Sequence, residues 1–263
     1  RGQVDAQVRT ELYTVTKNNG TRRTGILFKQ EDSNLAPTIY LEEFYQKYLK
    51  GQQVPDLADS ICSIYQEIRV KKTCDCQNLF DFNHVKEHIV YKLIRRDANE
   101  ELLKQIPYEP FLDLAVVYYI QMDNTRFGSA AIQIRNEHLR YWRVEKEEIR
   151  RLAEKNTPRI YPVQIRQIVR FMYVATNEQC SLGAAVMRYP DFREKVRGMI
   201  RGDFYILPSS IHEVILVPES FGLEPERMQE MVKEINQTGV APEEVLSDSV
   251  YYFDGEEIRI VAK

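Results

Sequence analysis

The residue types best suited to chemistry stand together in one short segment, Pro208-Ser-Ser-Ile-His-Glu213. A hydroxyl, an imidazole and a carboxylate are the groups that acyl transfer uses, and this segment carries all three in Ser209, Ser210, His212 and Glu213. Catalytic triads usually draw these groups from separated segments so that the side chains converge, and the chain has no Gly-x-Ser-x-Gly elbow. The favoured interpretation is a loop whose side chains bond the local backbone. The second is a binding edge formed by these four residues, and the third is a hydrolase with Ser210 as nucleophile and His212 as base.

A second pattern has the residue types of a zinc site. Cys74 and Cys76 are followed by His84 and His88, and two histidines four residues apart can share one helix face. The Cys-x-Cys spacing is tighter than in most zinc sites, and a chain of this size can fold without a metal. We therefore expect no metal and no cofactor, and keep a zinc-stabilised adaptor as a third class of function.

A carboxylate and a basic stretch are the remaining candidates. Asp113 interrupts an apolar run, so it is either a buried acid with a raised pKa or the first exposed turn of a strand. Arginines and lysines between residues 140 and 151 flank Tyr141 and Trp142, a composition found on RNA-binding faces. Glutamates at 145, 147 and 148 interleave with them, which favours a solvated helix with ion pairs.

The overall composition bounds the class of protein. The chain has 263 residues, of which 43 % are hydrophobic and 29 % charged, values typical of a folded globular protein. Its net charge of −3 gives no general attraction to nucleic acid. The longest apolar run, residues 112–120, is too short to span a membrane. Four cysteines are too few for a secreted disulfide framework, so we expect a cytoplasmic protein whose partner is another protein or a small molecule.

The N-terminal third predicts a hairpin followed by two helices. Residues 12–28 contain two β-prone runs around Asn18-Asn19-Gly20, a turn signal. Apolar residues at helical spacing predict helices at 41–49, with an apolar stripe of Leu41, Phe44, Tyr45, Tyr48 and Leu49, and at 55–68. The polar segment 71–83 predicts a boundary. We expect an N-terminal region, 1–80, and a larger C-terminal region, 81–263, packed as one body.

The C-terminal region predicts a mixed or antiparallel sheet with strand-strand-helix units, and the whole chain an α+β fold. Residues 112–120 are apolar on both faces, which indicates a central strand with residues 130–134 as its partner. Residues 89–95 alternate enough for a strand, but Val85, Ile89 and Leu93 would also fit one helix face, so the period does not decide. The other predicted elements are a short helix at 99–105, a turn capped by Asn136 that carries Leu139 and Trp142, a helix at 145–155 stopped by Asn156-Thr157-Pro158, a strand at 171–175 paired with 183–188, a helix from Asp191 to Gly202 with Glu194 completing a capping box, strands at 204–207 and 214–217, a helix from Pro225 to Gly239 with Met228, Met231, Val232 and Ile235 inward, and a hairpin at 251–260.

Several segments resemble a known family. They are Leu-Asp-Leu-Ala-Val-Val-Tyr at 112–118, residues 153–158, Pro-Ser-Ser-Ile-His-Glu-Val at 208–214, Lys-Asn-Asn-Gly at 17–20, Pro-Thr-Ile-Tyr-Leu at 37–41 and Glu-Val-Leu-Ser-Asp at 244–248. Over the whole chain the sequence is similar to a domain-of-unknown-function family of anaerobic gut Firmicutes, and more remotely to the YtpQ-like family of bacilli. The resemblance implies a cytoplasmic bacterial α+β protein and carries over no catalytic residue. The leading hypothesis is a non-enzymatic binding or interaction module that uses residues 208–213, and the alternative is a hydrolase.

Overall fold

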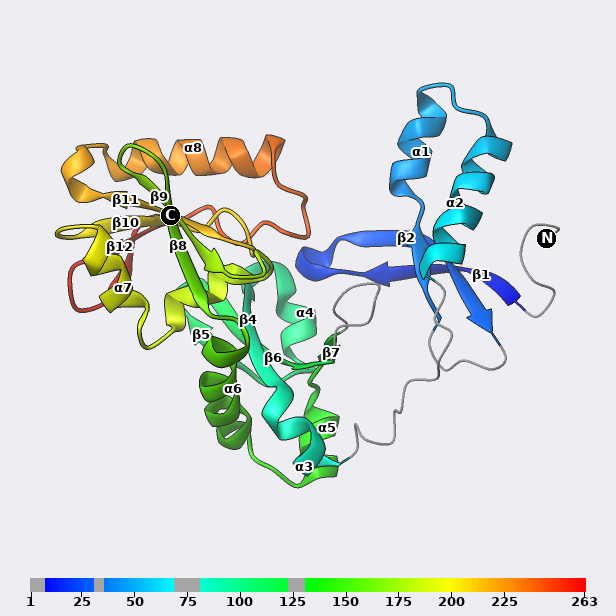
Figure 1. Cartoon of the computed structure of the whole chain (residues 1–263), viewed down its shortest axis with the longest axis horizontal. Coiled ribbons are helices and arrows are strands. Elements are labelled where there is room, and N and C mark those ends of the chain that lie inside the picture. The colour runs from blue at the N-terminus through cyan, green and yellow to red at the C-terminus, as the bar shows by residue number, and fades with distance from the viewer. Residues whose placement is uncertain (1–7, 31–35, 69–80, 123–130) are drawn as a thin grey trace. The chain divides into compact units, whose positions relative to one another are not determined.

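The computed structural model describes residues 8–30, 36–68, 81–122 and 131–263. The chain divides into two compact units, Arg1–Leu79 and Phe80–Lys263, which are described separately. In the described part of unit 1, a three-stranded sheet is accompanied by two α-helices (Figure 1). The elements of unit 1 are β1 (Val8–Thr16), η1 (Asn18–Gly20), β2 (Arg22–Gln30), β3 (Thr38–Tyr40), α1 (Glu42–Leu49) and α2 (Val54–Ile68).

Unit 1 confirms the predicted hairpin and both helices. β1 and β2 pair antiparallel, and Asn19 and Gly20 in the turn adopt positive φ angles of 58° and 68°. Phe28 of β2 stacks on Tyr65 of α2 with ring centroids 4.3 Å apart. The predicted apolar stripe of α1 is wrong, because Phe44 is its only buried member. The short helix turns a single side chain into the core, and the tyrosine and leucine side chains beside it stay exposed, Tyr45, Tyr48 and Leu49.

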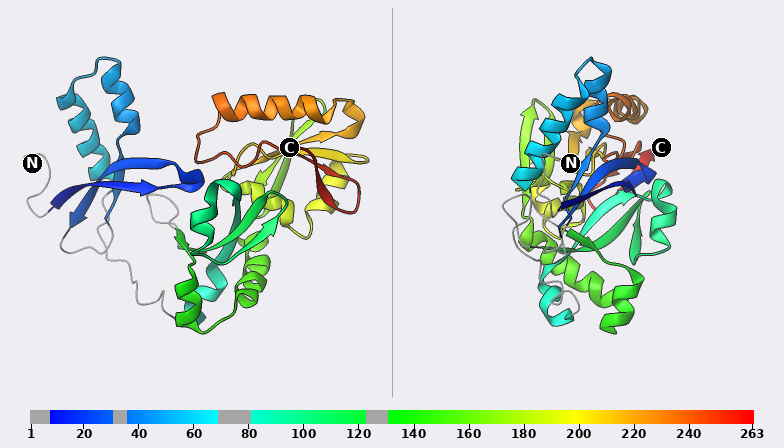
Figure 2. Two further views of the ribbon diagram at one scale, coloured as in Figure 1. Left: turned by 180° about the vertical axis from the view of Figure 1, so that it is seen from behind. Right: turned by 90° about the vertical axis from the view of Figure 1, so that its right-hand side faces the viewer.

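Unit 2 contains two antiparallel sheets and the helices that cover them (Figure 2). Its strands are β4 (Ile89–Arg95), β5 (Tyr108–Phe111), β6 (Leu114–Gln121), β7 (Ala131–Gln133), β8 (Val163–Val169), β9 (Met172–Asn177), β10 (Phe204–Leu207), β11 (Val214–Pro218), β12 (Val250–Phe253) and β13 (Ile258–Ala262). Its helices are α3 (Phe82–Val85), η3 (Lys86–His88), η4 (Asp97–Asn99), α4 (Glu100–Leu103), α5 (Asn136–Trp142), α6 (Lys146–Ile160), η5 (Gly183–Arg188), α7 (Phe192–Met199), η6 (Glu219–Phe221) and α8 (Pro225–Thr238).

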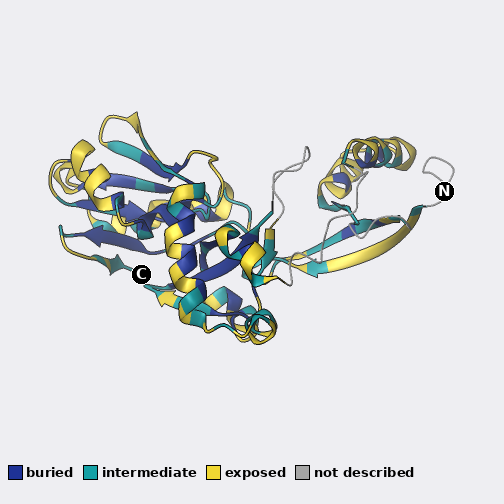
Figure 3. Ribbon diagram, turned by 60° about the horizontal axis from the view of Figure 1, so that its bottom comes forward, coloured by how far each residue is buried: buried dark blue, intermediate teal, exposed yellow. Residues whose placement is uncertain are grey.

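The first sheet of unit 2 is built around β6, as the sequence predicts. β6 pairs with β4 on one side and with β5 and then β7 on the other. Every residue from Leu114 to Ile120 is buried, so this strand is covered on both faces (Figure 3). β5 was not predicted from the sequence, because Tyr-Glu-Pro-Phe has neither an apolar run nor a clear alternation.

The helix on the first sheet continues past its predicted end. α6 runs through Asn156, Thr157 and Pro158 to Ile160, so the predicted stop is wrong. Both polar side chains are buried and bonded to the sheet: Asn156 Nδ2 donates to the Ile89 carbonyl at 3.0 Å, and Thr157 Oγ1 accepts from the Tyr91 amide at 3.0 Å. These bonds give the helix tertiary partners that outweigh the one amide donor lost at the proline.

The second sheet has the order β13-β12-β10-β11-β9-β8, with the hairpins predicted at 204–217 and 251–260. The predicted strand at 183–188 is wrong, since this segment forms the buried 3-10 helix η5 while β9 pairs with β8 and β11. A Cβ atom on Gly183 would come within 2.5 Å of the His212 carbonyl oxygen, so the glycine permits a close backbone approach. The apolar run Gly183–Met187 is too short to distinguish these two structures by itself.

Two helices pack on the second sheet with small departures from prediction. Met228 and Val232 of α8 are buried against β10, β11 and β12, whereas Met231 and Ile235 are exposed because only one narrow face meets the sheet. In α7, Asp191 makes no side-chain cap, so the predicted capping box is absent, and its carboxylate lies 2.8 Å from Lys195 Nζ. α7 also ends at Met199, before Gly202. Among the described residues, no helix is both long and apolar enough to cross a membrane.

Val116→Asp is expected to destabilise unit 2 severely. Val116 lies in the central strand with 2 % of its surface exposed, and burying an unpaired carboxylate there costs several kcal/mol. The melting temperature should fall by roughly 10 °C or more. Val169→Asp on the edge strand β8, where the valine is 56 % exposed, is the matched control and should cost less than about 1 kcal/mol. Equal melting temperatures for the two variants would contradict the central position of β6.

Candidate functional site

The segment with the catalytic residue types is paired with a later part of the chain. The Ile211 amide donates to the Glu244 carbonyl at 2.9 Å, and the Leu246 amide donates to the Ser209 carbonyl at 3.0 Å. Ser210 and Val245 form an antiparallel bridge between these two bonds. The backbone edge at residues 208–211 is therefore occupied by residues 244–247 of the same chain.

His212 is held by groups other than a serine hydroxyl. Its Nδ1 accepts from the Leu182 amide at 3.2 Å, and its Nε2 lies 3.3 Å from Glu244 Oε1. The Ser210 hydroxyl oxygen accepts instead from the His212 backbone amide at 3.1 Å. Both ring nitrogens thus have partners, and neither partner is a hydroxyl that the imidazole could activate. Ser209 and Glu213, the other two predicted residues, are half-buried in the same segment.

The predicted metal-binding residues divide between described and undescribed parts of the chain. Cys74 and Cys76 lie outside the described residues. His84 lies in α3 and His88 in η3, and the change of helix type between them removes the shared α-helical face. Within the described ranges, no group of three or more His, Cys, Asp or Glu side chains is arranged to hold a metal ion.

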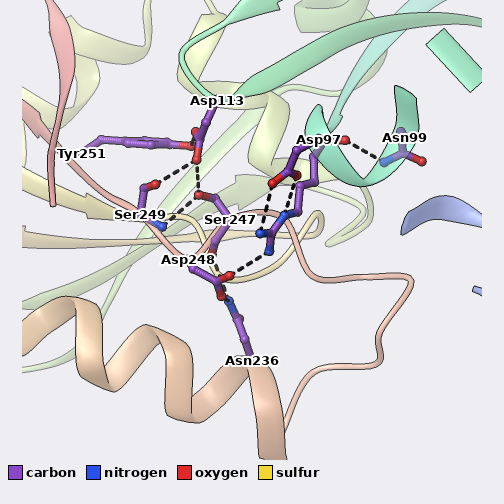
Figure 4. Close-up of polar contacts among 9 residues, drawn as sticks. Asp97, Asn99, Asp113, Asn236, Ser247, Asp248, Ser249 and Tyr251 are labelled. Atoms are coloured by element: carbon purple, nitrogen blue, oxygen red, sulfur yellow. Dashed lines mark hydrogen bonds and ion pairs between the residues drawn. The ribbon is translucent and has the colours of Figure 1, made fainter. Parts of the chain in front are cut away.

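Asp113, by contrast, accepts hydrogen bonds from three hydroxyls at the turn between β5 and β6 (Figure 4). Ser247 Oγ and Ser249 Oγ donate to Oδ2 at 2.6 and 2.8 Å, and the Tyr251 hydroxyl donates to Oδ1. The preceding residue, Leu112, adopts a left-handed φ of 57°, which forms the turn that carries this carboxylate. Burial, and then the charge of Asp113, raise the pKa of Tyr251 well above its usual value, so its hydroxyl stays a donor at neutral pH.

Arg95 at the end of β4 forms the second polar cluster of the site. Its Nε and Nη2 atoms donate to the Asp97 carboxylate at 2.8 and 3.3 Å, and Nη1 donates to Asp248 Oδ2 at 2.8 Å (Figure 4). Asn236 of α8 donates to the other Asp248 oxygen at 2.8 Å and to the Ser247 carbonyl at 2.9 Å. The segment before β12 is therefore bonded to both a strand end and a helix.

These contacts set the charge states of the cluster. The hydrogen bonds to Asp97, opposed by burial and supported by Asp248, raise the pKa of Arg95 further above its already high value. The Arg95 bond lowers the pKa of Asp97. For Asp248, burial raises the pKa, but hydrogen bonds from Asn236 and Arg95 outweigh it and the net shift is downward. At neutral pH all three groups are charged.

A cavity of about 250 Å³ lies over the two clusters. Four separate parts of the chain form its walls: the end of β4, the turn before β6, helix α8 and the segment around β12 and β13. Its lining residues are Arg95, Arg96, Asp97, Asp113, Lys233, Asp248, Ser249 and Lys263.

A larger cavity of about 450 Å³ lies near the end of α6 and is lined in part by His88, Gln121, Arg159 and Tyr161. Its walls also join distant segments: Arg159 donates to the Glu87 carbonyl at 2.9 Å, and the Tyr161 hydroxyl donates to Gln121. We place the candidate site at the smaller cavity because it has the denser network of polar side chains: Arg95 bonds two carboxylates, and Asp113 accepts from three hydroxyls.

Sequence reasoning found one member of this site and missed the rest. Asp113 was singled out, and the structure shows a half-buried carboxylate bonded to three hydroxyls, which neither sequence interpretation anticipated. The signal for its partners was the Ser-Asp-Ser triplet at 247–249 directly before a β-prone run. Arg95 and Asn236 gave no sequence signal, since each lies in an ordinary strand or helix pattern.

Comparison with known proteins identifies one family. The profile of a family of unknown function (DUF5688) matches residues 1–172 and 169–255. This confirms the predicted membership of an uncharacterised domain-of-unknown-function family. No curated protein and no solved structure matches the chain.

Asp113→Ala should destabilise unit 2 by about 2–4 kcal/mol, because three hydroxyls lose a charged acceptor. Asp97→Ala is the matched control, since that side chain is 69 % exposed and its ion pair with Arg95 is worth less than about 1 kcal/mol. Equilibrium unfolding in urea measures both free energies. Equal losses in the two variants would show that the bonds to Asp113 do not hold the unit together.

His212→Ala should lower the free energy of unfolding by about 1–2 kcal/mol, through the lost bonds to Leu182 and Glu244. His84→Ala, at an exposed position of α3, should change it by less than about 0.5 kcal/mol. Urea unfolding of the two variants provides the measurement. If His212→Ala is as stable as the parent, the ring does not have the structural role that its contacts indicate.

Proposed function

The chain belongs to this family of unknown function, and we propose that it is a non-enzymatic binding module whose ligand site is the cavity beside Asp113 and Arg95. We also propose a cytoplasmic bacterial protein, in keeping with the resemblance to families of gut Firmicutes and bacilli. One observation carries this proposal: the charged side chains of the cavity are already held in place by hydrogen bonds within the protein.

Such preorganisation favours binding, because the entropy of ordering polar side chains is lost during folding instead of at the moment of association. The three hydroxyls fix the Asp113 carboxylate. Asp97 and Asp248 fix the Arg95 guanidinium, and Asn236 in turn holds Asp248. The ordered side chains then offer a defined pattern of charges to a small molecule that enters the cavity.

The segments that carry the family resemblance also meet at this site. Asp113 belongs to 112–118, and Ser247 and Asp248 belong to 244–248. The Ser247 amide donates to the carbonyl of Pro208, the first residue of 208–214, at 3.0 Å. Residues 208–211 therefore contribute to the site indirectly, because their backbone pairs with the segment that carries Ser247.

The hydrolase alternative gains no support from the geometry. In the candidate cavity, the described lining residues include no histidine or cysteine, and both serine hydroxyls donate to Asp113 without an imidazole between them. At residues 208–213, the imidazole contacts Leu182 and Glu244 rather than Ser210 Oγ.

A small-molecule screen by amide NMR on the whole chain tests the proposal. At least one chemical class is expected to shift the amide resonances of residues 95–97, 113 and 247–249 in a saturable manner, without turnover. Parallel incubation with ester, amide and phosphoester substrates should give no product. A hydrolytic activity that disappears in His212→Ala would overturn the proposal in favour of the hydrolase, and a screen with no saturable shift at these residues would overturn it as well.

A further inference from the structure

The charges around the candidate cavity are not evenly matched once their contacts are assigned. Four cationic side chains and three carboxylates line it. Asp97 and Asp248 are both paired with Arg95, and Asp113 is surrounded by hydroxyl donors. Each carboxylate of the cavity is therefore already satisfied within the protein.

The three remaining cationic side chains of the lining differ from Arg95 in their contacts. Arg96, Lys233 and Lys263 are exposed and line the cavity, and within the described residues none of them makes an ion pair or side-chain hydrogen bond. Arg96 is also fixed in place at the backbone, because its amide donates to the Asp113 carbonyl at 3.2 Å. The seven charges of the lining sum to +1, and the charge of Lys233 contributes to lowering the pKa of Asp248. The cavity therefore has a small excess of positive charge, carried by exposed side chains that form no close ion pair.

The Arg95 guanidinium adds directed donors to this positive surface. A guanidinium carries five N–H groups, and three of them are used by Asp97 and Asp248. One N–H remains on each of the two terminal nitrogens, in a group that two aspartates hold in place through three hydrogen bonds. Planar, fixed donors of this kind recognise carboxylate and phosphate oxygens well.

We infer that the ligand of this cavity is a small oxyanion, a compound that presents a carboxylate or a phosphate to Arg96, Lys233 and the unused donors of Arg95. The inference rests on the proposed binding function and names its ligand class. A cavity of about 250 Å³ lies below the ~300–1,000 Å³ of typical ligand pockets, so the compound has few atoms beyond its anionic group. A cationic ligand would have to displace Arg95 or the hydroxyls from carboxylates that they already satisfy.

The experiment is an amide NMR titration of the whole chain at low ionic strength in a cationic buffer. Inorganic phosphate and succinate are the two anionic probes, and glycerol and ethanolamine are neutral and cationic probes of similar size. Both anions are expected to shift the amides of residues 95–97, 113 and 247–249, and the shifts should weaken in 0.5 M sodium chloride because the contacts are partly exposed. Tighter binding of phosphate indicates a phosphate-bearing ligand, and tighter binding of succinate a carboxylate-bearing one.

Two substitutions and one matched control connect the binding to this cavity. Arg96→Gln and Lys233→Gln should each raise the dissociation constant of the anions about tenfold, a loss typical of one charge-assisted contact. Arg227→Gln removes a positive charge from the same helix α8 away from the cavity lining, and should leave the dissociation constant unchanged. All three residues are exposed, and circular dichroism melts verify that the variants fold.

The possible failures are distinguishable. If glycerol or ethanolamine binds at these residues and the anions do not, the oxyanion inference is wrong and the binding function stands. If the anions bind equally well to Lys233→Gln, Arg96→Gln and the parent, the positive charges of this cavity do not recognise them and the inference also fails. If neither these probes nor any compound of the wider screen shifts the cavity residues, the proposed function fails together with the inference.

Discussion

The architecture of unit 2 depends on one half-buried carboxylate. Asp113 lies at the turn that leads into the central strand of the first sheet. Of its three hydroxyl donors, Ser247 and Ser249 lie just before β12 of the second sheet and Tyr251 lies within it. The two sheets share no strand, so this contact is a direct polar connection between them. A partly desolvated carboxylate is tolerated only where donors replace its lost water, and the two serines and the tyrosine do so.

Hydrogen bonds from half-buried or buried polar side chains also connect other distant segments of unit 2. Asn156 and Thr157 bond α6 to β4, Asn236 bonds α8 to the segment before β12, and His212 bonds its loop to η5 and to Glu244. In each case a polar side chain satisfies a backbone group that no ladder partner can reach. Apolar burial supplies the bulk of the stability, while these bonds determine which segments lie side by side.

This division explains what could be predicted from the sequence. Periodicity and turn signals located β6, the terminal hairpin and α8, because each buries one regular face or both faces. They failed where a tertiary bond decides the outcome: the Asn-Thr-Pro run signals a helix end, yet the bonds of Asn156 and Thr157 to β4 keep α6 intact. Likewise Gly183 and the small apolar residues after it suit a strand, and only the close approach to residue 212 shows why the backbone coils there.

The candidate site lay beyond the sequence for a related reason. Arg95, Asp113, Asn236 and Ser247 are separated by up to 152 positions and acquire meaning only when strand pairing and helix docking bring them together. The compact Ser-Ser-Ile-His-Glu segment drew attention because its chemistry is adjacent in sequence, but adjacency places such side chains on alternating sides of an extended backbone. Its backbone instead pairs with residues 244–247, and this pairing sets the position of Ser247, at the end of the paired segment, and of Ser249 two residues later. Residues 208–213 and the cavity are therefore structurally connected. Residues 208–211 pair with residues 244–247, and the residues that follow, 248 and 249, form part of the cavity wall.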